Sequence, residues 1–320
     1  MKNSVLRLTK SATFLSLLMA IAISSCSSEN QDIRPLQNPT EHTAFEELSL
    51  SIEKKTDEFF AMHSPDSGSR KSFWSRLFHV VWSDVSTTAI AFFTSFDFKD
   101  SAEKGGAASV QTALKEIHDV LTSNSPIANL TCTSDKINNL LKESLTMLNK
   151  QSYELGDKNI GLWHNAIVLT MITDGISVKD DLNAISLAAA NSSKKLSKSS
   201  GLDCNYSTSD YGKLIYNTTN SFFETIYDED PTIICDNIAR KYTSYSNEMN
   251  IIKTFYLKLI YCHNLEEIDK LTDLYIYEVD KSNISEKSKT IINIQLSVAK
   301  NSSILWDMVY NDINTLKLSN

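Results

Sequence analysis

Apolar residues recur at every third or fourth position along most of this chain, which is the spacing of amphipathic helices. The stripe formed by Phe45, Leu48, Ile52, Phe59 and Met62 is the first clear case. The 320-residue chain contains only eight glycines and five prolines, and long stretches contain neither. Because these two residues interrupt helices most strongly, their scarcity favours continuous helices. The pattern therefore predicts an all-α fold, a multi-helix, bundle-like globular body.

The same spacing locates the individual helices. They are predicted over residues 45–62, 71–96, 101–121, 134–153, 160–173, 214–227, 232–245, 248–261, 265–279 and 285–313, and a further helix opens near residue 178. Gly175 is expected to end the helix over 160–173, because glycine adopts the left-handed conformation of a helix C-terminus at low cost. The stretch "LYIYEVD" at 274–280 is rich enough in β-branched and aromatic residues to form a strand instead.

Two polar stretches divide the chain into parts. Residues 26–43 contain proline and lack any apolar period, as expected of a flexible tether. Residues 192–204 are rich in serine and lysine and predict a linker. These stretches would leave one helical subdomain at 44–191 and a second at 205–320.

The first 25 residues have the pattern of a secretory signal peptide. Lys2, Arg7 and Lys10 precede an apolar run that ends in small residues. The run is too short to cross a bilayer, which takes about 20 apolar residues. Residues 1–25 are therefore expected to be removed.

The stretch "ISSC", which ends at Cys26, resembles the lipobox of bacterial lipoproteins, although Ile23 stands where leucine is commonest. The resemblance implies cleavage before Cys26, a covalent lipid on its sulfur and attachment to a membrane through that lipid. Ser27 is not the aspartate that retains such proteins in the inner membrane, so the resemblance favours the outer membrane of a Gram-negative cell. It leaves open whether the body faces the periplasm or the cell surface. The alternative is a secreted protein in which Cys26 carries no lipid.

Charge narrows the choice of partners. Removal of residues 1–25, which carry three cations and no acid, would shift the formal net charge from −8 to −11. The field of such an acidic chain repels polyanions. Nucleic acid is therefore excluded as a partner, and an anionic membrane surface is a poor one.

The remaining cysteines are Cys132, Cys204, Cys235 and Cys262. An even number in an oxidising compartment favours two disulfides, for which three connectivities exist. The alternative is a free nucleophilic thiol. No CxxC spacing indicates a redox or zinc motif.

The stretch "NIGLWHNAIV" places His164 and Asn165 inside an apolar run. A helix that is apolar nearly all round is typical of a protein interior. There His164 would use both ring nitrogens and Asn165 would link adjacent helices through its amide. The functional alternative places His164 at a cleft, facing a carboxylate or a second histidine.

A second polar pair, His263 and Asn264, follows Cys262 in "IYCHNLEEI" and suggests a thiol hydrolase. Asn165 or Asn264 would orient the imidazole. Adjacent residues on a helix point about 100° apart, however, so Cys262 and His263 are poorly placed to act as nucleophile and base. His164 is the other candidate base.

Metal and cofactor chemistry finds little support in the sequence. No two of the six histidines have the i, i+4 spacing that places two ligands on one helical face. There is no HExxH, no glycine-rich phosphate loop and no GxSxG. No metal and no cofactor is predicted apart from the covalent lipid on Cys26.

Residues 73–96 combine aromatic and aliphatic side chains after the cations Arg70 and Lys71. One interpretation is a membrane-active helix that inserts beside the lipid anchor. Asp84 and several serines and threonines interrupt the apolar run, which favours a buried helical hairpin instead.

The stretches "VVWSDVSTTA", "GLWHN" and "LSVAKNSSILW", together with the lipobox, resemble those of uncharacterised Gram-negative lipoproteins with a Gly-x-x-His-Asn element. The resemblance directs attention to Gly161, His164 and Asn165 and implies no activity. Three functions are consistent with the sequence. The first is a lipid-anchored envelope protein with a binding or structural role toward a protein or glycan. The second is a hydrolase or metal enzyme centred on His164, and the third is a membrane-active protein.

Overall fold

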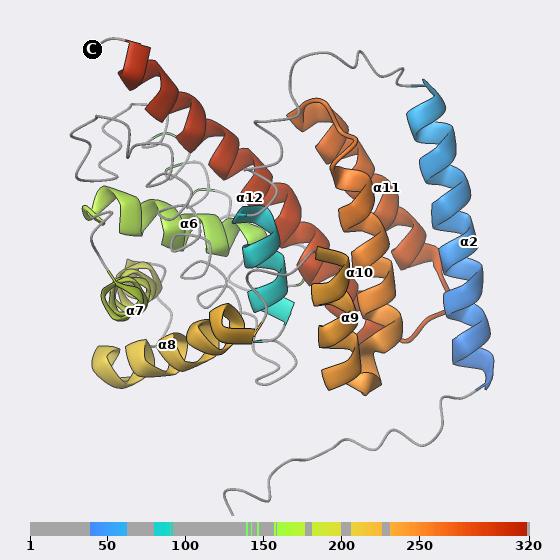
Figure 1. The fold of residues 1–320 in the computed structure, drawn as a ribbon, viewed down its shortest axis with the longest axis horizontal. Coiled ribbons are helices and arrows are strands. Elements are labelled where there is room, and N and C mark those ends of the chain that lie inside the picture. Colours follow the sequence, from blue (N-terminus) through green and yellow to red (C-terminus); the bar gives the residue numbers. More distant parts are fainter. Residues whose placement is uncertain are drawn as a thin grey trace, which may run out of the picture. The chain divides into compact units, whose positions relative to one another are not determined.

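The computed structural model describes residues 39–62, 80–89, 91, 139, 142, 146, 157, 159–176, 181–199, 206–225 and 231–318. Residues Pro39–Asn320 form one compact unit. All regular secondary structure in the described residues is helical, and they contain no strand (Figure 1). The predicted all-α fold is confirmed.

The labelled helices are α2 (Pro39–Met62), α6 (Ile160–Thr173), α7 (Leu182–Ser199), α8 (Thr208–Thr225), α9 (Pro231–Lys241), η1 (Thr243–Tyr245), α10 (Ser246–Leu259), α11 (Leu265–Lys281) and α12 (Glu286–Leu318). Residues 80–89 are also helical and are called segment 80–89 below. The predictions for 1–38, for 101–121 and for most of 71–96 and 134–153 lie outside the described residues.

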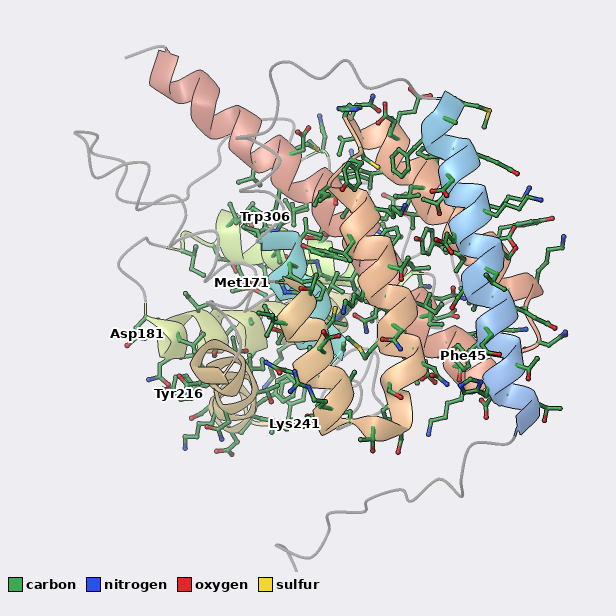
Figure 2. All side chains as sticks on the ribbon, turned by 45° about the vertical axis from the view of Figure 1, so that its right-hand side comes forward. Phe45, Met171, Asp181, Tyr216, Lys241 and Trp306 are labelled. Carbon is green, nitrogen blue, oxygen red and sulfur yellow. The ribbon has the colours of Figure 1, made fainter. Side chains whose placement is uncertain are left out.

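Helix α12 is central to the packing of this unit. It packs against α6, α10 and α11, while α2 lies against α10 and α11, and α7 joins α6 to α8 (Figure 1). Every residue from 291 to 299 is buried, so this part of α12 is enclosed on all sides. Figure 2 shows Met171 and Trp306 among the helices, whereas Asp181 and Lys241 lie at the periphery. The apolar stripe of α12 accounts for one buried face, and packing of the neighbouring helices also buries Asn293, Gln295 and Ser297 on its other faces.

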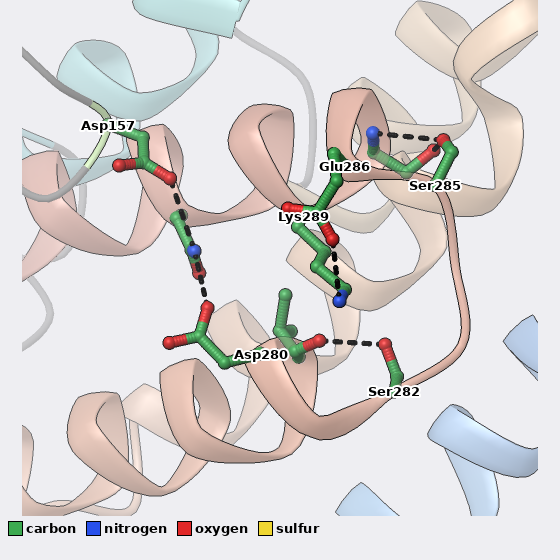
Figure 3. Close-up of polar contacts among 9 residues, drawn as sticks. Asp157, Asp280, Ser282, Ser285, Glu286 and Lys289 are labelled. Carbon is green, nitrogen blue, oxygen red and sulfur yellow. Dashed lines mark hydrogen bonds and ion pairs between the residues drawn. The ribbon is translucent and has the colours of Figure 1, made fainter.

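The connection from α11 to α12 is built from short-range hydrogen bonds (Figure 3). The hydroxyl of Ser282 donates to the carbonyl of Val279 at 2.7 Å, and the amide of Ser288 donates to the hydroxyl of Ser285 at 3.2 Å. Serine is favoured before a helix, as at Ser285, because its oxygen accepts from an amide that the helix leaves unpaired. These bonds end α11 and begin α12 within a few residues.

Asn293 of α12 lies between two carboxylates. Its Nδ2 is 3.1 Å from Oδ1 of Asp280 and 3.3 Å from Oδ2 of Asp157 (Figure 3). One amide group therefore links α12 to α11 and to the residues that precede α6. A buried amide that donates twice in this way fixes the relative position of three parts of the chain.

The end of α6 confirms the role predicted for Gly175. Its φ is +93°, and its amide donates to the carbonyl of Ile172 at 3.1 Å. Helix α7 then begins with a side-chain cap, in which Oδ1 of Asp181 accepts from the amide of Ala184 at 2.9 Å. Both ends are local features that the residue types favour.

Two expectations from the sequence need correction. Residues 192–199, expected to belong to a linker, continue α7. Ser192, Ser193 and Ser197 are buried, and small side chains of this kind allow helices to pack closely. Helix α2 begins at Pro39, inside the expected tether 26–43, because proline suits the first position of a helix.

The helix predicted over 265–279 is confirmed by α11, which includes "LYIYEVD". The alternative of a strand there is wrong, because Leu271, Tyr275 and Val279 share one buried helical face. The expected subdomains 44–191 and 205–320 belong to the one unit Pro39–Asn320.

Candidate functional site

Helix α6 carries the histidine and asparagine that the sequence singled out. Every residue of α6 is buried except Leu162 and Thr173. The prediction of an interior helix is confirmed. Its polar side chains must therefore find their partners inside the protein.

His164 faces a carboxylate that comes from far away in the chain. Its Nε2 lies 3.0 Å from Oδ1 of Asp84 in segment 80–89, and both side chains are 0% exposed. The contact is an ion pair whose direction departs from ideal hydrogen-bond geometry. Asp84 is thus the carboxylate that the functional hypothesis for His164 required, but the pair is closed to solvent.

The second oxygen of Asp84 reaches α12. Oδ2 accepts a short hydrogen bond from the hydroxyl of Ser302. Ser302 is fully buried as well. One carboxylate therefore connects segment 80–89 to both α6 and α12.

Asn165 completes the link between α6 and α12. Its Nδ2 donates to the carbonyl of Asn301 at 2.8 Å, and Nδ2 of Asn301 in turn donates to the carbonyl of Ser297 at 2.9 Å. The Oδ1 atom of Asn165 lies 3.2 Å from Nδ1 of His164. Asn165 performs the helix-linking role that the sequence suggested for it.

Gly161 lies at a close approach of α6 to α12. Its amide donates to the hydroxyl of Ser297 at 3.1 Å, and a Cβ at this position would lie 2.2 Å from the Ser297 carbonyl oxygen. No side chain fits there. In the Gly-x-x-His-Asn element, Gly161 and Asn165 therefore contact α12, whereas His164 contacts segment 80–89.

The electrostatics of the pair favour a charged imidazole. Burial by itself lowers the pKa of His164, but the charge of Asp84 and the hydrogen bonds to Asp84 and Asn165 outweigh it, so the pKa lies above its usual value. Tyr256 of α10 is buried nearby, its ring centroid 4.2 Å from that of Trp82. Burial and the charge of Asp84 raise the pKa of Tyr256, so this phenol stays neutral.

Ser302, Asp84 and His164 have the residue types of a hydrolytic triad, but they contact one another in a different order. The serine donates to the aspartate rather than to the histidine. A nucleophilic serine needs a hydrogen bond to the base that removes its proton. This arrangement therefore holds three segments together and has no activated nucleophile.

The motif around Cys262 is a helix cap. Asn264 is the N-cap of α11, where its Oδ1 accepts from the amide of Glu267 at 2.9 Å. The carboxylate of Glu267 accepts from the amide of His263 at 2.7 Å and from Nδ2 of Asn264 at 3.0 Å. These reciprocal bonds are a form of the capping box. They explain the polar residues of "CHNLEE" without catalysis.

Cys262 and Cys235 are buried free thiols. Burial, aided by the charge of Glu267, raises the pKa of Cys262 to about 12. Burial raises the pKa of Cys235 to about 12 as well, against the effect of Lys253. Such thiols are protonated at neutral pH and are poor nucleophiles. The prediction of two disulfides is wrong for these two cysteines, while Cys132 and Cys204 lie outside the described residues.

Within the described part of the chain, no three or more His, Cys, Asp and Glu residues are grouped so that they could hold a metal ion. No helix in that part is both long and apolar enough to span a bilayer. The described portion of the proposed membrane-active stretch, segment 80–89, is buried throughout.

Sequence reasoning did not identify the residues of the network that lie outside α6. Asp84, Ser297, Asn301 and Ser302 each stand as polar residues inside apolar stretches. They lie in "VVWSDVSTTA" and "LSVAKNSSILW", two of the stretches on which the resemblance to lipoproteins rests. Polar residues in buried helices usually have partners in other buried helices. That signal identifies the set of candidates but not the pairs.

No known family model matches this sequence, and no match was found among curated proteins or among solved structures.

Proposed function

We propose that this protein is a lipid-anchored protein of the cell envelope that binds another protein, and that the His164 network is part of its architecture. The observation that carries the proposal is the contrast between a sealed polar pair and an exposed apolar surface. That surface, called the end patch here, consists of Phe60 and Met62 at the end of α2 and Ile260 and Tyr261 after α10.

The end patch combines aromatic and aliphatic side chains. Met62 is 76% exposed, Tyr261 59% and Ile260 45%. The ring of Phe60 lies against that of Tyr261, with 6.1 Å between their centroids. The α2 and α10 helices that carry these residues pack against each other (Figure 1). Adjoining exposed apolar groups are typical of protein interaction sites, where they supply most of the binding energy.

The chemistry beside the patch favours a protein over a glycan. A sugar site needs polar groups that can hydrogen-bond hydroxyls around an aromatic ring. Asn264 and Glu267, which follow Tyr261 in the sequence, already bond to each other in the cap of α11. Lys258 forms an ion pair with Asp57, with 3.4 Å between Nζ and Oδ1. The groups that would recognise a sugar are thus engaged, while the apolar surface suits a protein.

The anchor supports the same arrangement. If Cys26 carries the lipid, the chain between it and Pro39 reaches at most about 45 Å from the membrane. Helix α2 has 24 residues and is about 35 Å long. The end patch therefore lies about one helix length from the point where the tether enters α2. The end patch is at the end of α2 away from the tether, where a protein of the envelope could bind it.

The two alternatives have less support. A hydrolase or metal enzyme centred on His164 needs substrate access to a side chain that is 0% exposed. A membrane-active role for residues 73–96 needs the release of segment 80–89, which is buried. Ser27 and the lipobox favour the outer membrane of a Gram-negative cell as the location.

A site-specific photo-crosslinking experiment in intact cells tests the proposal. A photoreactive phenylalanine analogue replaces Tyr261 in one variant and Tyr277 in the other. Tyr277, 56% exposed on α11, is the matched control for Tyr261, which is 59% exposed. We expect a defined crosslinked protein at position 261 only, and its loss when Ile260→Ser is added. Equal crosslinking at both positions, or none at 261, overturns the binding proposal.

The anchor is tested separately by metabolic labelling with a radioactive fatty acid. The full-length chain should incorporate the label, and Cys26→Ala should abolish it. Label that persists in Cys26→Ala, or no label in the unaltered chain, overturns the lipid anchor without affecting the result at Tyr261.

A further inference from the structure

We propose that the His164–Asp84 contact is a protonation-dependent clamp, which holds segment 80–89 against α6 and α12 and loosens it before the rest of the fold as pH rises. The clamp is independent of the partner proposed for the end patch. It follows from the hydrogen-bonding requirements of four side chains.

The orientation of Asn165 can be assigned from its partners. A backbone carbonyl accepts only, so the Asn165 atom that lies 2.8 Å from the Asn301 carbonyl must be the donating Nδ2. The acceptor Oδ1 then faces Nδ1 of His164 at 3.2 Å. Nδ1 must carry a proton to make this contact favourable.

The other ring nitrogen faces an acceptor too. Nε2 lies 3.0 Å from Oδ1 of Asp84. These two atoms are not aligned for a hydrogen bond. A negative carboxylate this close in a buried site nevertheless favours a positive imidazole ring, and therefore a proton on Nε2 as well. A histidine with protons on both nitrogens is the charged imidazolium. The geometry therefore selects the charged form, and the raised pKa of His164 agrees with it.

The described hydrogen-bond partners of His164 and Asp84, namely Asn165 and Ser302, are neutral. Segment 80–89 contributes Asp84, α12 contributes the neutral Asn301 and Ser302, and α10 contributes the neutral phenol of Tyr256. On α6 and α7, the nearest ion pair in the described residues is Asp174 with Lys195, which is exposed. It lies about 15 Å along α6 from His164. Loss of the proton thus leaves Asp84 as a buried carboxylate that has lost its cation.

Segment 80–89 depends strongly on this carboxylate. Its residues are all buried, yet the hydroxyls of Ser86, Thr87 and Thr88 have no hydrogen-bond partner. The carboxylate of Asp84 connects the segment to α6 and to α12. When the connection from Asp84 to α6 weakens, segment 80–89 should loosen before the other helices. Its loosening would expose the apolar residues Val80, Val81, Trp82 and Val85.

The direction of the pH effect follows from linkage. Folded His164 binds its proton more tightly than an unfolded histidine, whose pKa is about 6.5. The stabilisation is fully present below that value and is lost as pH rises through the higher pKa of folded His164. Between the two values, each pH unit weakens the clamp about tenfold.

Hydrogen exchange of the whole protein, followed by mass spectrometry from about pH 6 to about pH 8.5, tests the clamp above the usual histidine pKa. Rates are corrected for the intrinsic effect of pH on exchange. We expect protection in peptides of segment 80–89 to fall by about tenfold or more relative to peptides of α11. Protection that is constant, or that falls equally in both sets of peptides, overturns the proposal.

Three variants sharpen the test. Asp84→Asn removes the charge that favours imidazolium, so burial dominates and the protection of segment 80–89 should rise with pH instead. His164→Gln should remove the pH dependence. His42→Gln, which alters an exposed pair with Glu46 at 3.4 Å, should behave like the unaltered protein. If Asp84→Asn and His164→Gln do not fold, the unaltered protein and His42→Gln still decide the question.

Discussion

The amide of Gly161 donates to the hydroxyl of Ser297 at 3.1 Å across the contact between α6 and α12. The absence of a side chain at Gly161 allows this approach, because a Cβ there would lie 2.2 Å from the Ser297 carbonyl oxygen. Beside it, Asn165 donates to the carbonyl of Asn301 across the same contact, and His164 pairs with Asp84 of segment 80–89. The closeness of the two backbones and the polar network are thus parts of one arrangement.

Gly161→Ala should destabilise the protein by about 3 kcal/mol, because α6 must move away from α12 and the neighbouring hydrogen bonds lengthen. Urea unfolding followed by circular dichroism measures the change. Gly175→Ala serves as the comparison, since a Cβ at Gly175 meets nothing and only the positive φ of +93° is unfavourable. Its expected cost is about 1 kcal/mol. Equal losses in the two variants would contradict the steric account of Gly161.

Asp84→Ala should cost about 4 kcal/mol near neutral pH, because the buried His164 loses its counterion and must either stay charged alone or give up its proton. The loss is measured by denaturant unfolding. Glu46→Ala, which breaks the exposed pair with His42, should change stability by less than about 1 kcal/mol. A small effect of Asp84→Ala would show that the buried pair adds little to the stability of the fold.

The thiols of Cys235 and Cys262 should resist alkylation by iodoacetamide in the native protein. Both are buried, and the pKa of each is raised to about 12, so little thiolate exists at neutral pH. Mass spectrometry of the digested protein locates the modified cysteines. Both thiols should react readily in urea. Rapid native labelling of Cys262 would revive the thiol-hydrolase hypothesis.

Asn264→Ala should destabilise the protein by about 1 kcal/mol, because the start of α11 loses a capping side chain. Asn264→Ser should retain most of the stability, since serine caps helices nearly as well. Thermal unfolding of the two variants provides the comparison. If both variants lose the same stability, the polar residues after Cys262 have a role other than capping.

Local features of this protein were predictable from the order of its residues. The helix over Ile160–Thr173, its end at Gly175 and its burial follow from a continuous apolar run with a glycine after it. The buried face of α12 follows in the same way from its apolar stripe. These features depend on contacts within a few turns, and the helical repeat makes such contacts visible in one stretch of sequence.

Local reasoning was less successful where burial decides the outcome. Residues 192–199 look like a linker because they are rich in serine and lysine, yet Ser192, Ser193 and Ser197 face the interior of the unit and the stretch is helical. Small polar residues have a weak preference for any structure. Packing of the neighbouring helices therefore determines their conformation.

The sequence by itself determined the helical class, the interior position of α6 and the candidates His164 and Asn165. Only the tertiary structure decided that His164 pairs with Asp84, that Asn301 accepts from Asn165 and that Cys235 and Cys262 stay free. Asn165 and Asn301 are separated by 136 positions, and Ser302 and Asp84 by 218. A helical period reports which face of a helix is buried. It contains no information about which distant helix covers that face, because that depends on how all the helices pack together.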